Sequence, residues 1–166
     1  MQKRLGQTAE RISLATFRRT SVYSLGRREP ATVTPDRSLA DAIGVMQAGE
    51  TRSVLVTEAD GRLVGIFTER DVVLRALGPA VDLRAPIEHY MSRDPEAVHP
   101  DDNLGHALDV MQRGRHHGLP VVDGTGRVIG HLDSRDVLEY VAEAFPQEVL
   151  NLPPRPHQLL DQPEGA

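Results

Sequence analysis

Between Leu39 and Met46, apolar residues recur at three- and four-residue spacing, which predicts a helix with one apolar face. Ser38 stands just before this pattern and Asp41 follows three residues later, as in a capping box at a helix start. Gly49 is expected to end the helix, because glycine commonly follows the last helical turn.

Two short apolar runs follow, at residues 54–56 and 63–67, and they flank Asp60-Gly61. An Asp-Gly pair between apolar runs is a strong indication of a β-hairpin. A second helix is expected from Thr68, its cap, to about Leu77. Three residues should lie on its apolar side: Val72, Val73 and Leu77. With the extended residues 31–36 in front, the predicted order is strand, helix, strand, strand, helix.

The same order returns 65 positions later without a gap. Of the 41 residues at positions 33–73, 16 are identical to the residue 65 places further on. Unrelated segments would share about one residue in fifteen to twenty, so this is an internal repeat. Each unit is too small to close a core alone and has a sheet face to bury. We therefore expect the two units to pack against each other about a pseudo-twofold axis.

The composition is that of an ordinary globular protein, with 39% apolar and 26% charged residues. There is no run of the roughly 18 apolar residues that a membrane helix needs, so no membrane contact is expected. The absence of cysteine excludes disulfides, thiolate zinc sites and cysteine nucleophiles, and agrees with a reducing compartment. We expect a cytoplasmic protein.

Charge is distributed unevenly. Residues 1–28 carry seven basic residues and one acidic residue, hence +6, so the rest must be −11 to give the net −5. An acidic body makes nucleic-acid binding unlikely as the main role. The serine- and arginine-rich start also resembles a transit peptide, which leaves organelle import as the alternative localisation. The favoured interpretation is a basic N-terminal arm over 1–28, partly helical and packed on the body or solvated.

The strand-to-helix junction carries the candidate chemistry. Thr68 and the first helical amides could hold an anion, and Asp71 could accept two hydrogen bonds from a vicinal diol. Phosphate beside a diol acceptor suits a ribose phosphate. In the second copy these positions are Asp133 and Asp136. The same residues also form a capping box, and an isolated example of this spacing favours capping.

These motifs together resemble a tandem pair of CBS domains over about residues 28–144. The resemblance rests on Val-x-Pro-Asp before the first helix, on the Asp-Gly or Gly-Thr-Gly-Arg hairpin, and on Gly-x-x-Thr-x-x-Asp or its variant. It implies an α+β fold of two β-α-β-β-α repeats, each with a three-stranded mixed sheet, at 29–80 and 88–144. A proline-rich tail follows at 145–166. It also implies a homodimer, since CBS pairs commonly dimerise.

In the family that the chain resembles, the aspartate binds ribose hydroxyls and the serine or threonine contacts phosphate. The adenine lies against the first strand, here Thr32 and Val33 or Ala97 and Val98, and a basic residue at the place of Arg52 or His117 often reaches phosphate. Apolar walls would include Val54, Ile66, Leu119, Pro120 and Leu132. The predicted ligand-binding residues are therefore Thr32, Val33, Arg52, Val54, Thr68, Arg70, Asp71, Ala97, Val98, His117, Leu119, Pro120, Asp133 and Asp136.

The two sites should not be equivalent. Asp133 replaces Thr68, and a carboxylate a few ångströms from a phosphate is repelled by about a kcal/mol or more. We expect the Asp71 site to take the phosphorylated nucleotide. The Asp136 site would be empty, take a ligand without phosphate, or need a bridging cation. For Arg115 and His116, a solvated loop is the favoured interpretation.

No catalytic set stands out, and the adjacent His116 and His117 suit one metal ion poorly. We therefore expect neither an enzyme nor a metal site nor a catalytic cofactor. The predicted function is a regulatory module that senses AMP, ADP, ATP or S-adenosylmethionine and modulates an unknown protein. The alternative is a dimerisation or scaffold protein that acts through its basic arm and proline-rich tail.

Overall fold

The structure of the 166-residue chain is a computed structural model that describes residues 14–26 and 28–144. The proline-rich tail and the first part of the basic arm lie outside the described residues. In the described part, no helix has both the length and the apolar character needed to cross a membrane.

The first repeat forms a mixed four-stranded sheet in the order β1-β2-β3-β4. Strands β1 and β2 are parallel, and the other neighbouring pairs are antiparallel. The fourth strand comes from the linker between the repeats, so this sheet has one strand more than the three expected. The elements are β1 (Thr32–Val33), α3 (Leu39–Ala48), β2 (Ser53–Thr57), β3 (Leu63–Thr68), α4 (Glu69–Arg75), a 3-10 turn η2 (Ile87–His89) and β4 (Ser92–Arg93).

The second repeat has only two regular strands, which pair antiparallel. Its outer strands are reduced to single bridges, from Val98 to Val121 and from Arg28 to His131. In the first sheet, the Leu55 amide donates to Ala31 at 2.8 Å, whereas the equivalent Pro120 has no N–H to donate. The elements are α2 (Leu14–Arg19), η1 (Val22–Ser24), α5 (Leu104–Gly114), β5 (Gly118–Val122), β6 (Val128–Asp133) and α6 (Ser134–Ala144).

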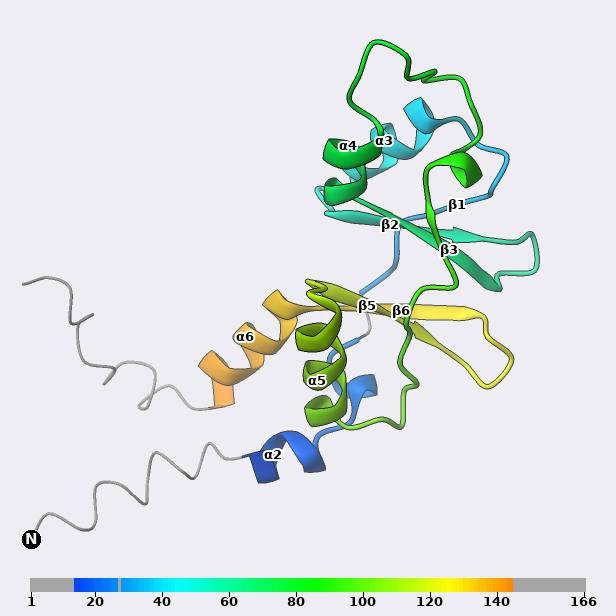
Figure 1. The fold of residues 1–166 in the computed structure, drawn as a ribbon. Helices are drawn as coiled ribbons and strands as arrows, with labels where there is room; N and C mark the ends of the chain where they lie inside the picture. Colours follow the sequence, from blue (N-terminus) through cyan, green and yellow to red (C-terminus); the bar gives the residue numbers. More distant parts are fainter. Residues whose placement is uncertain (1–13, 27, 145–166) are drawn as a thin grey trace, which may run out of the picture.

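The two sheets face each other, and the helices cover their outer faces (Figure 1). Each sheet packs on its helices through a separate apolar core, one built around Phe67 and one around Leu132. The predicted helix starts are confirmed, since Ser38 accepts from the Asp41 amide and Thr68 from the Asp71 amide. The tandem α+β architecture predicted from the sequence is therefore confirmed.

Each core is completed by the segment that precedes the opposite repeat. Val22, from the arm, lies in the second core, and Ile87, from the linker, lies in the first; both are fully buried. The backbone contacts match at the 65-residue offset: Val22 donates to Asp102 and Ile87 donates to Arg37, each at 2.7 Å. The structural repeat therefore begins near residue 20, ahead of Val33, where the identities between the two copies were first counted.

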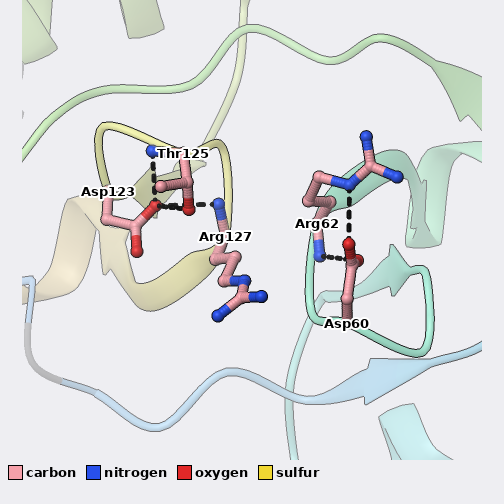
Figure 2. A network of polar contacts seen from close by, with 5 residues as sticks. All are labelled: Asp60, Arg62, Asp123, Thr125 and Arg127. Carbon is pink, nitrogen blue, oxygen red and sulfur yellow. Dashed lines mark hydrogen bonds and ion pairs between the residues drawn. The ribbon is translucent and has the colours of Figure 1, made fainter.

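The tips of the two hairpins bond to each other across the pseudo-twofold axis. The Leu63 amide donates to Gly126 and the equivalent Val128 amide donates to Gly61, both at 3.0 Å. Inside each tip an aspartate ties the turn together (Figure 2). Asp60 accepts from the backbone and the side chain of Arg62, which lowers the pKa of Asp60. Asp123 accepts from Thr125 and from the Arg127 amide, which lowers its pKa as well.

One detail of the predicted packing is wrong. Val73 and Leu77 are 63% and 67% exposed rather than buried in the core. Helix α4 has only seven residues, so its sheet-facing side is limited mainly to Asp71 and Val72, with Ala76 buried just after it. The exposed apolar residues lie on its outer side.

Two equivalent glycines let the crossing segments lie against the sheets. A Cβ on Gly130 would meet the backbone oxygen of Gly26, and one on Gly65 would meet the side chain of Met91. A backbone oxygen that is fixed in place cannot move aside as a methionine side chain can. These two contacts explain why the repeated motif keeps a glycine at this point.

We expect Gly130→Ala to lower the free energy of unfolding by about 1–3 kcal/mol, as overpacking does, and Gly65→Ala to cost less. Gly44→Ala is the matched control, because a Cβ there meets nothing within 4 Å. It should leave stability unchanged or raise it, since alanine is the better helix former. Chemical denaturation measures all three. Equal losses at positions 65 and 130 would contradict this account of the crossing.

Candidate functional site

A cleft of about 540 Å³ lies between the two repeats. This volume is within the roughly 300–1,000 Å³ of small-molecule sites. Its centre is lined by four pairs of residues that are equivalent at the 65-residue offset: Arg52 and His117, Ser53 and Gly118, Ile66 and His131, Thr68 and Asp133. The cleft therefore crosses the pseudo-twofold axis.

Beyond this centre, the described lining includes residues of α4 but none of α6. Asp71 and Arg75 line the cleft, whereas their equivalents Asp136 and Tyr140 are not in its wall. The loop before β5 adds Arg115 and His116 on the opposite side.

Eight of the fourteen predicted ligand-binding residues line the cleft: Arg52, Thr68, Arg70, Asp71, His117, Leu119, Pro120 and Asp133. The structure does not bring the other six to it: Thr32, Val33, Val54, Ala97, Val98 and Asp136. The side chains of Val33, Val54 and Val98 belong to the two cores. Of the other apolar walls expected, Ile66 lines the cleft and Leu132 is fully buried in the second core.

Asp71 keeps one carboxylate oxygen nearly unused. Its Oδ2 accepts from the Thr68 amide at 2.9 Å and from the Thr68 hydroxyl at 2.8 Å. Among the described residues, its Oδ1 has only Arg75, at 3.5 Å, which is an ion pair rather than a good hydrogen bond. Oδ1 can therefore accept from a ligand hydroxyl. The Thr68 hydroxyl, in contrast, already donates to Asp71, so it would have to exchange that bond to reach a phosphate.

In Asp136, both carboxylate oxygens are engaged. Arg28 lies 2.6 Å from Oδ1, and the Asp133 amide donates to Oδ2 at 2.8 Å. The hydrogen bond with Asp136 raises the pKa of Arg28 above its ordinary value. Charge-assisted bonds of this length are among the stronger ones, although the half-exposed guanidinium limits the gain. A ligand diol would have to displace Arg28.

The difference between the two aspartates follows from one helix position. Arg75 stands one turn after Asp71 and donates to the Tyr90 and Met91 carbonyls at 3.0 and 3.2 Å. The equivalent residue of α6 is Tyr140, whose hydroxyl is 3.1 Å from that of Thr20. Helix α6 thus offers no cation to Asp136 at this position, and Arg28 of the arm pairs with it instead.

Among the described residues, formal charges cancel in the wall of the cleft. Four arginines and four carboxylates line it: Arg52, Arg70, Arg75, Arg115, Glu69, Asp71, Glu96 and Asp133. The histidines His116, His117 and His131 complete its ionisable set, and His116 lies 3.5 Å from Glu96. Within residues 14–26 and 28–144, no group of three or more potential protein ligands is placed to hold a metal ion.

His131 is the buried histidine of the cleft, with 8% of its surface exposed. Its Nε2 is covered and has no hydrogen-bond partner among the described residues. Such a nitrogen is unfavourable by about 1–3 kcal/mol. Burial lowers the pKa of His131, against the opposing charges of Asp133 and Asp136.

His131 and Arg28 were not among the residues predicted from the sequence. Arg115 and His116 are exposed, as expected for a solvated loop, but they also line the cleft. The offset itself carried part of this information: Arg28 and Pro30 match Arg93 and Pro95, which extends the repeat into the arm. The offset also shows that His131 is equivalent to Ile66 of the first repeat. That its imidazole would be buried without a partner was not visible, because this depends on the opposing strand.

Comparison with known proteins agrees with the fold and the duplication. The CBS domain family model matches residues 22–78 and 87–143. The chain therefore belongs to the CBS domain family and contains two such domains in tandem.

Individual relatives show the same module in different settings. A 17.7 kDa protein of Acidianus ambivalens is 31% identical over 71% of each chain. Inosine-5′-monophosphate dehydrogenase of Methanocaldococcus jannaschii is 32% identical over 68% of this chain but only 22% of its own length. The CBS domain pair of protein MJ0100, solved in complex with 5′-methylthioadenosine and S-adenosyl-L-methionine, is 25% identical. That match covers 73% of this chain and 98% of the other, with a TM-score of 0.64.

Burial of neutral His131 should make stability depend on pH. An unfolded histidine takes up its proton near pH 6.5, before His131 does so in the folded protein. The free energy of unfolding should therefore fall as the pH decreases from about 6.5 to the lowered pKa, by at most about 1.4 kcal/mol per pH unit.

Replacing His131 by the residue of the first repeat, as His131→Ile, should flatten this part of the pH profile. His89→Gln, at an exposed histidine, is the control and should keep the slope. Chemical denaturation at several pH values between 5 and 8 measures the free energy of unfolding of the wild type and both variants. If His131→Ile retained the slope of the wild type, its burial would not be the cause.

Proposed function

We propose that this CBS pair is a regulatory module that binds one adenosine-type nucleotide per chain, with the ribose at Asp71. The observation that carries the proposal is the one-ended cleft: it reaches the nearly unused Oδ1 of Asp71, and it stops short of Asp136. A related CBS pair, that of MJ0100, was solved with two adenosine-type ligands, which supports this class of ligand.

The remaining cleft residues support the same orientation. From Asp71, the cleft leads to its centre, where Arg52 and His117 could contact phosphate. Asp133 is the carboxylate on the far side of that centre, and its repulsion would keep phosphate on the side of the first repeat. No catalytic cofactor enters this account.

Regulation would follow from the position of the ligand between the repeats. A ligand that contacts both sheets favours the arrangement in which they are closest, and so shifts the population of conformations. The arm and the linker cross between the repeats, so they are the segments that would carry the change to a partner protein.

Substitution of the two aspartates tests the proposal. Asp71→Asn keeps the size and most hydrogen bonds of the cap but removes the charge, and it should weaken AMP binding by tenfold or more, the cost of about 1.4 kcal/mol. Asp136→Asn is the matched control and should weaken AMP binding far less than Asp71→Asn does. Calorimetry with AMP, ADP, ATP and S-adenosylmethionine measures both.

A wild-type protein that responds to none of these ligands would favour the scaffold alternative. Equal losses in the two variants would contradict the one-ended cleft while leaving nucleotide binding intact. The two outcomes are therefore distinguishable.

We also propose a homodimer through the outer sides of α4 and α6. Val73 and Leu138 are equivalent at the 65-residue offset and are 63% and 67% exposed, and Leu74 and Leu77 extend the apolar surface of the first repeat. Large exposed apolar side chains at equivalent places of the two repeats are the kind of surface that an interface between copies would cover.

Val73→Asp combined with Leu138→Asp should convert the dimer to a monomer, because each change would place a charge in the interface. Both residues are exposed in the single chain, so folding should be unaffected. Light scattering after size-exclusion chromatography measures the mass. A wild-type protein that is monomeric at high concentration, or a double variant that remains dimeric, would overturn this assignment.

A further inference from the structure

His131 is a buried ionisable side chain in the wall of the cleft, and the nucleotide contacts proposed above do not use it. Its Nε2 has no partner among the described residues, although His131 is one of the residues that line the cleft. Buried polar atoms in folded proteins are nearly always hydrogen-bonded, so an exception beside a cleft is a candidate for a ligand contact.

Packing alone does not require a histidine here. The equivalent residue of the first repeat is Ile66, which also lines the cleft. The imidazole fits because residue 118 is glycine: a Cβ there would lie 2.6 Å from Cε1 and 2.9 Å from Nε2 of His131. The first repeat has serine at that position. The second repeat thus has a histidine and a glycine where the first has an isoleucine and a serine.

The charge of the cleft gives this histidine a role. Because the four arginines and the four carboxylates among the described wall residues cancel, a charge on His131 would make the wall more attractive to an anion. His116 and His117 are exposed, whereas His131 is buried and belongs to one of the four equivalent pairs at the centre. A charge on His131 is therefore less screened by water than a charge on the other two.

The charged groups that face His131 act on its protonation in opposite directions. Asp133 on its own strand and Asp136 on α6 favour the imidazolium, while Arg28, from the segment before β1, opposes it. Strand β5 contributes only uncharged residues at this point, Gly118 and Pro120. Burial outweighs the two carboxylates and lowers the pKa of His131. A phosphate at the centre would add a negative charge and a hydrogen-bond acceptor, both of which favour the imidazolium.

We propose that His131 is a specificity-determining residue that distinguishes phosphate-bearing ligands from uncharged ones. When phosphate enters the centre of the cleft, the imidazole turns from Gly118 toward it, takes up one proton from the solvent and donates a hydrogen bond to a phosphate oxygen. This inference rests on the proposed function for the identity of the ligand. It adds that AMP is preferred over adenosine, and increasingly so as the pH falls.

Proton uptake on binding tests the proposal directly. Calorimetry of AMP binding at pH 7 in buffers of different ionisation enthalpy should show uptake of up to one proton per AMP, and almost none with adenosine. AMP binding should tighten by up to about tenfold for each unit of pH decrease in this range. His131→Ile should lose most of the uptake and still bind adenosine. The control, His89→Gln, at an exposed histidine that does not line the cleft, should keep all of it.

An independent measurement separates this inference from the proposed function. The His131 ring resonance, followed by NMR through a pH titration, should report a pKa that rises on addition of pyrophosphate. Such a rise without binding of any adenosine-type ligand would overturn the proposed function and retain the role of His131. If pyrophosphate leaves the titration unchanged, or if His131→Ile takes up as many protons with AMP as the wild type, the role of His131 is overturned.

Discussion

Each repeat of this protein completes its core with the segment that leads into the other repeat. The arm passes over the second sheet at Gly130, and the linker passes over the first sheet at Gly65. Val22 and Ile87 are fully buried at the two crossings, so neither core is complete without a segment from outside its own repeat. This reciprocal crossing holds the two sheets face to face and creates the cleft between them. The paired hairpin tips fix the sheets at the other end.

Within this nearly symmetric frame, the function depends on a few positions at which the repeats differ. Tyr140 replaces Arg75 in the second repeat, so Asp136 forms its ion pair with Arg28 instead. The cleft does not reach this aspartate. The change from Thr68 to Asp133 places a carboxylate at the centre. The change from Ile66 to His131 places an ionisable group there as well. Duplication thus supplies the two-walled cleft, and divergence of the copies makes it one-ended.

The fold could be predicted from the sequence because the patterns that specify it are local and occur in both repeats. Caps at Ser38 and Thr68, an Asp-Gly hairpin and the constant 65-residue offset each specify structure within one repeat. The reciprocal crossing could not be predicted in this way, because it depends on contacts between segments far apart in the chain. The strand from Ser92 to Arg93 was missed for the same reason.

For the candidate site too, residues in local motifs could be predicted from the sequence, whereas contacts between distant segments could not. Residues of the strand-to-helix junction, such as Asp71, and of the loops before the inner strands, such as Arg52 and His117, line the cleft as expected. Residues of the first strands do not line the cleft. Each of these short segments pairs with the inner strand beside it and buries its valine, Val33 or Val98, in a core. The engagement of Asp136 by Arg28 joins residues 108 positions apart, which no local pattern encodes.

The central claim is that the two equivalent aspartates have unequal access, so that one nucleotide binds per chain. Native mass spectrometry of the whole protein at saturating AMP counts the bound ligands without any substitution. The account predicts one AMP per chain, also in the dimer. Two AMP molecules per chain, filled with similar affinity, would contradict it, because the Asp136 end would then be as open as the Asp71 end.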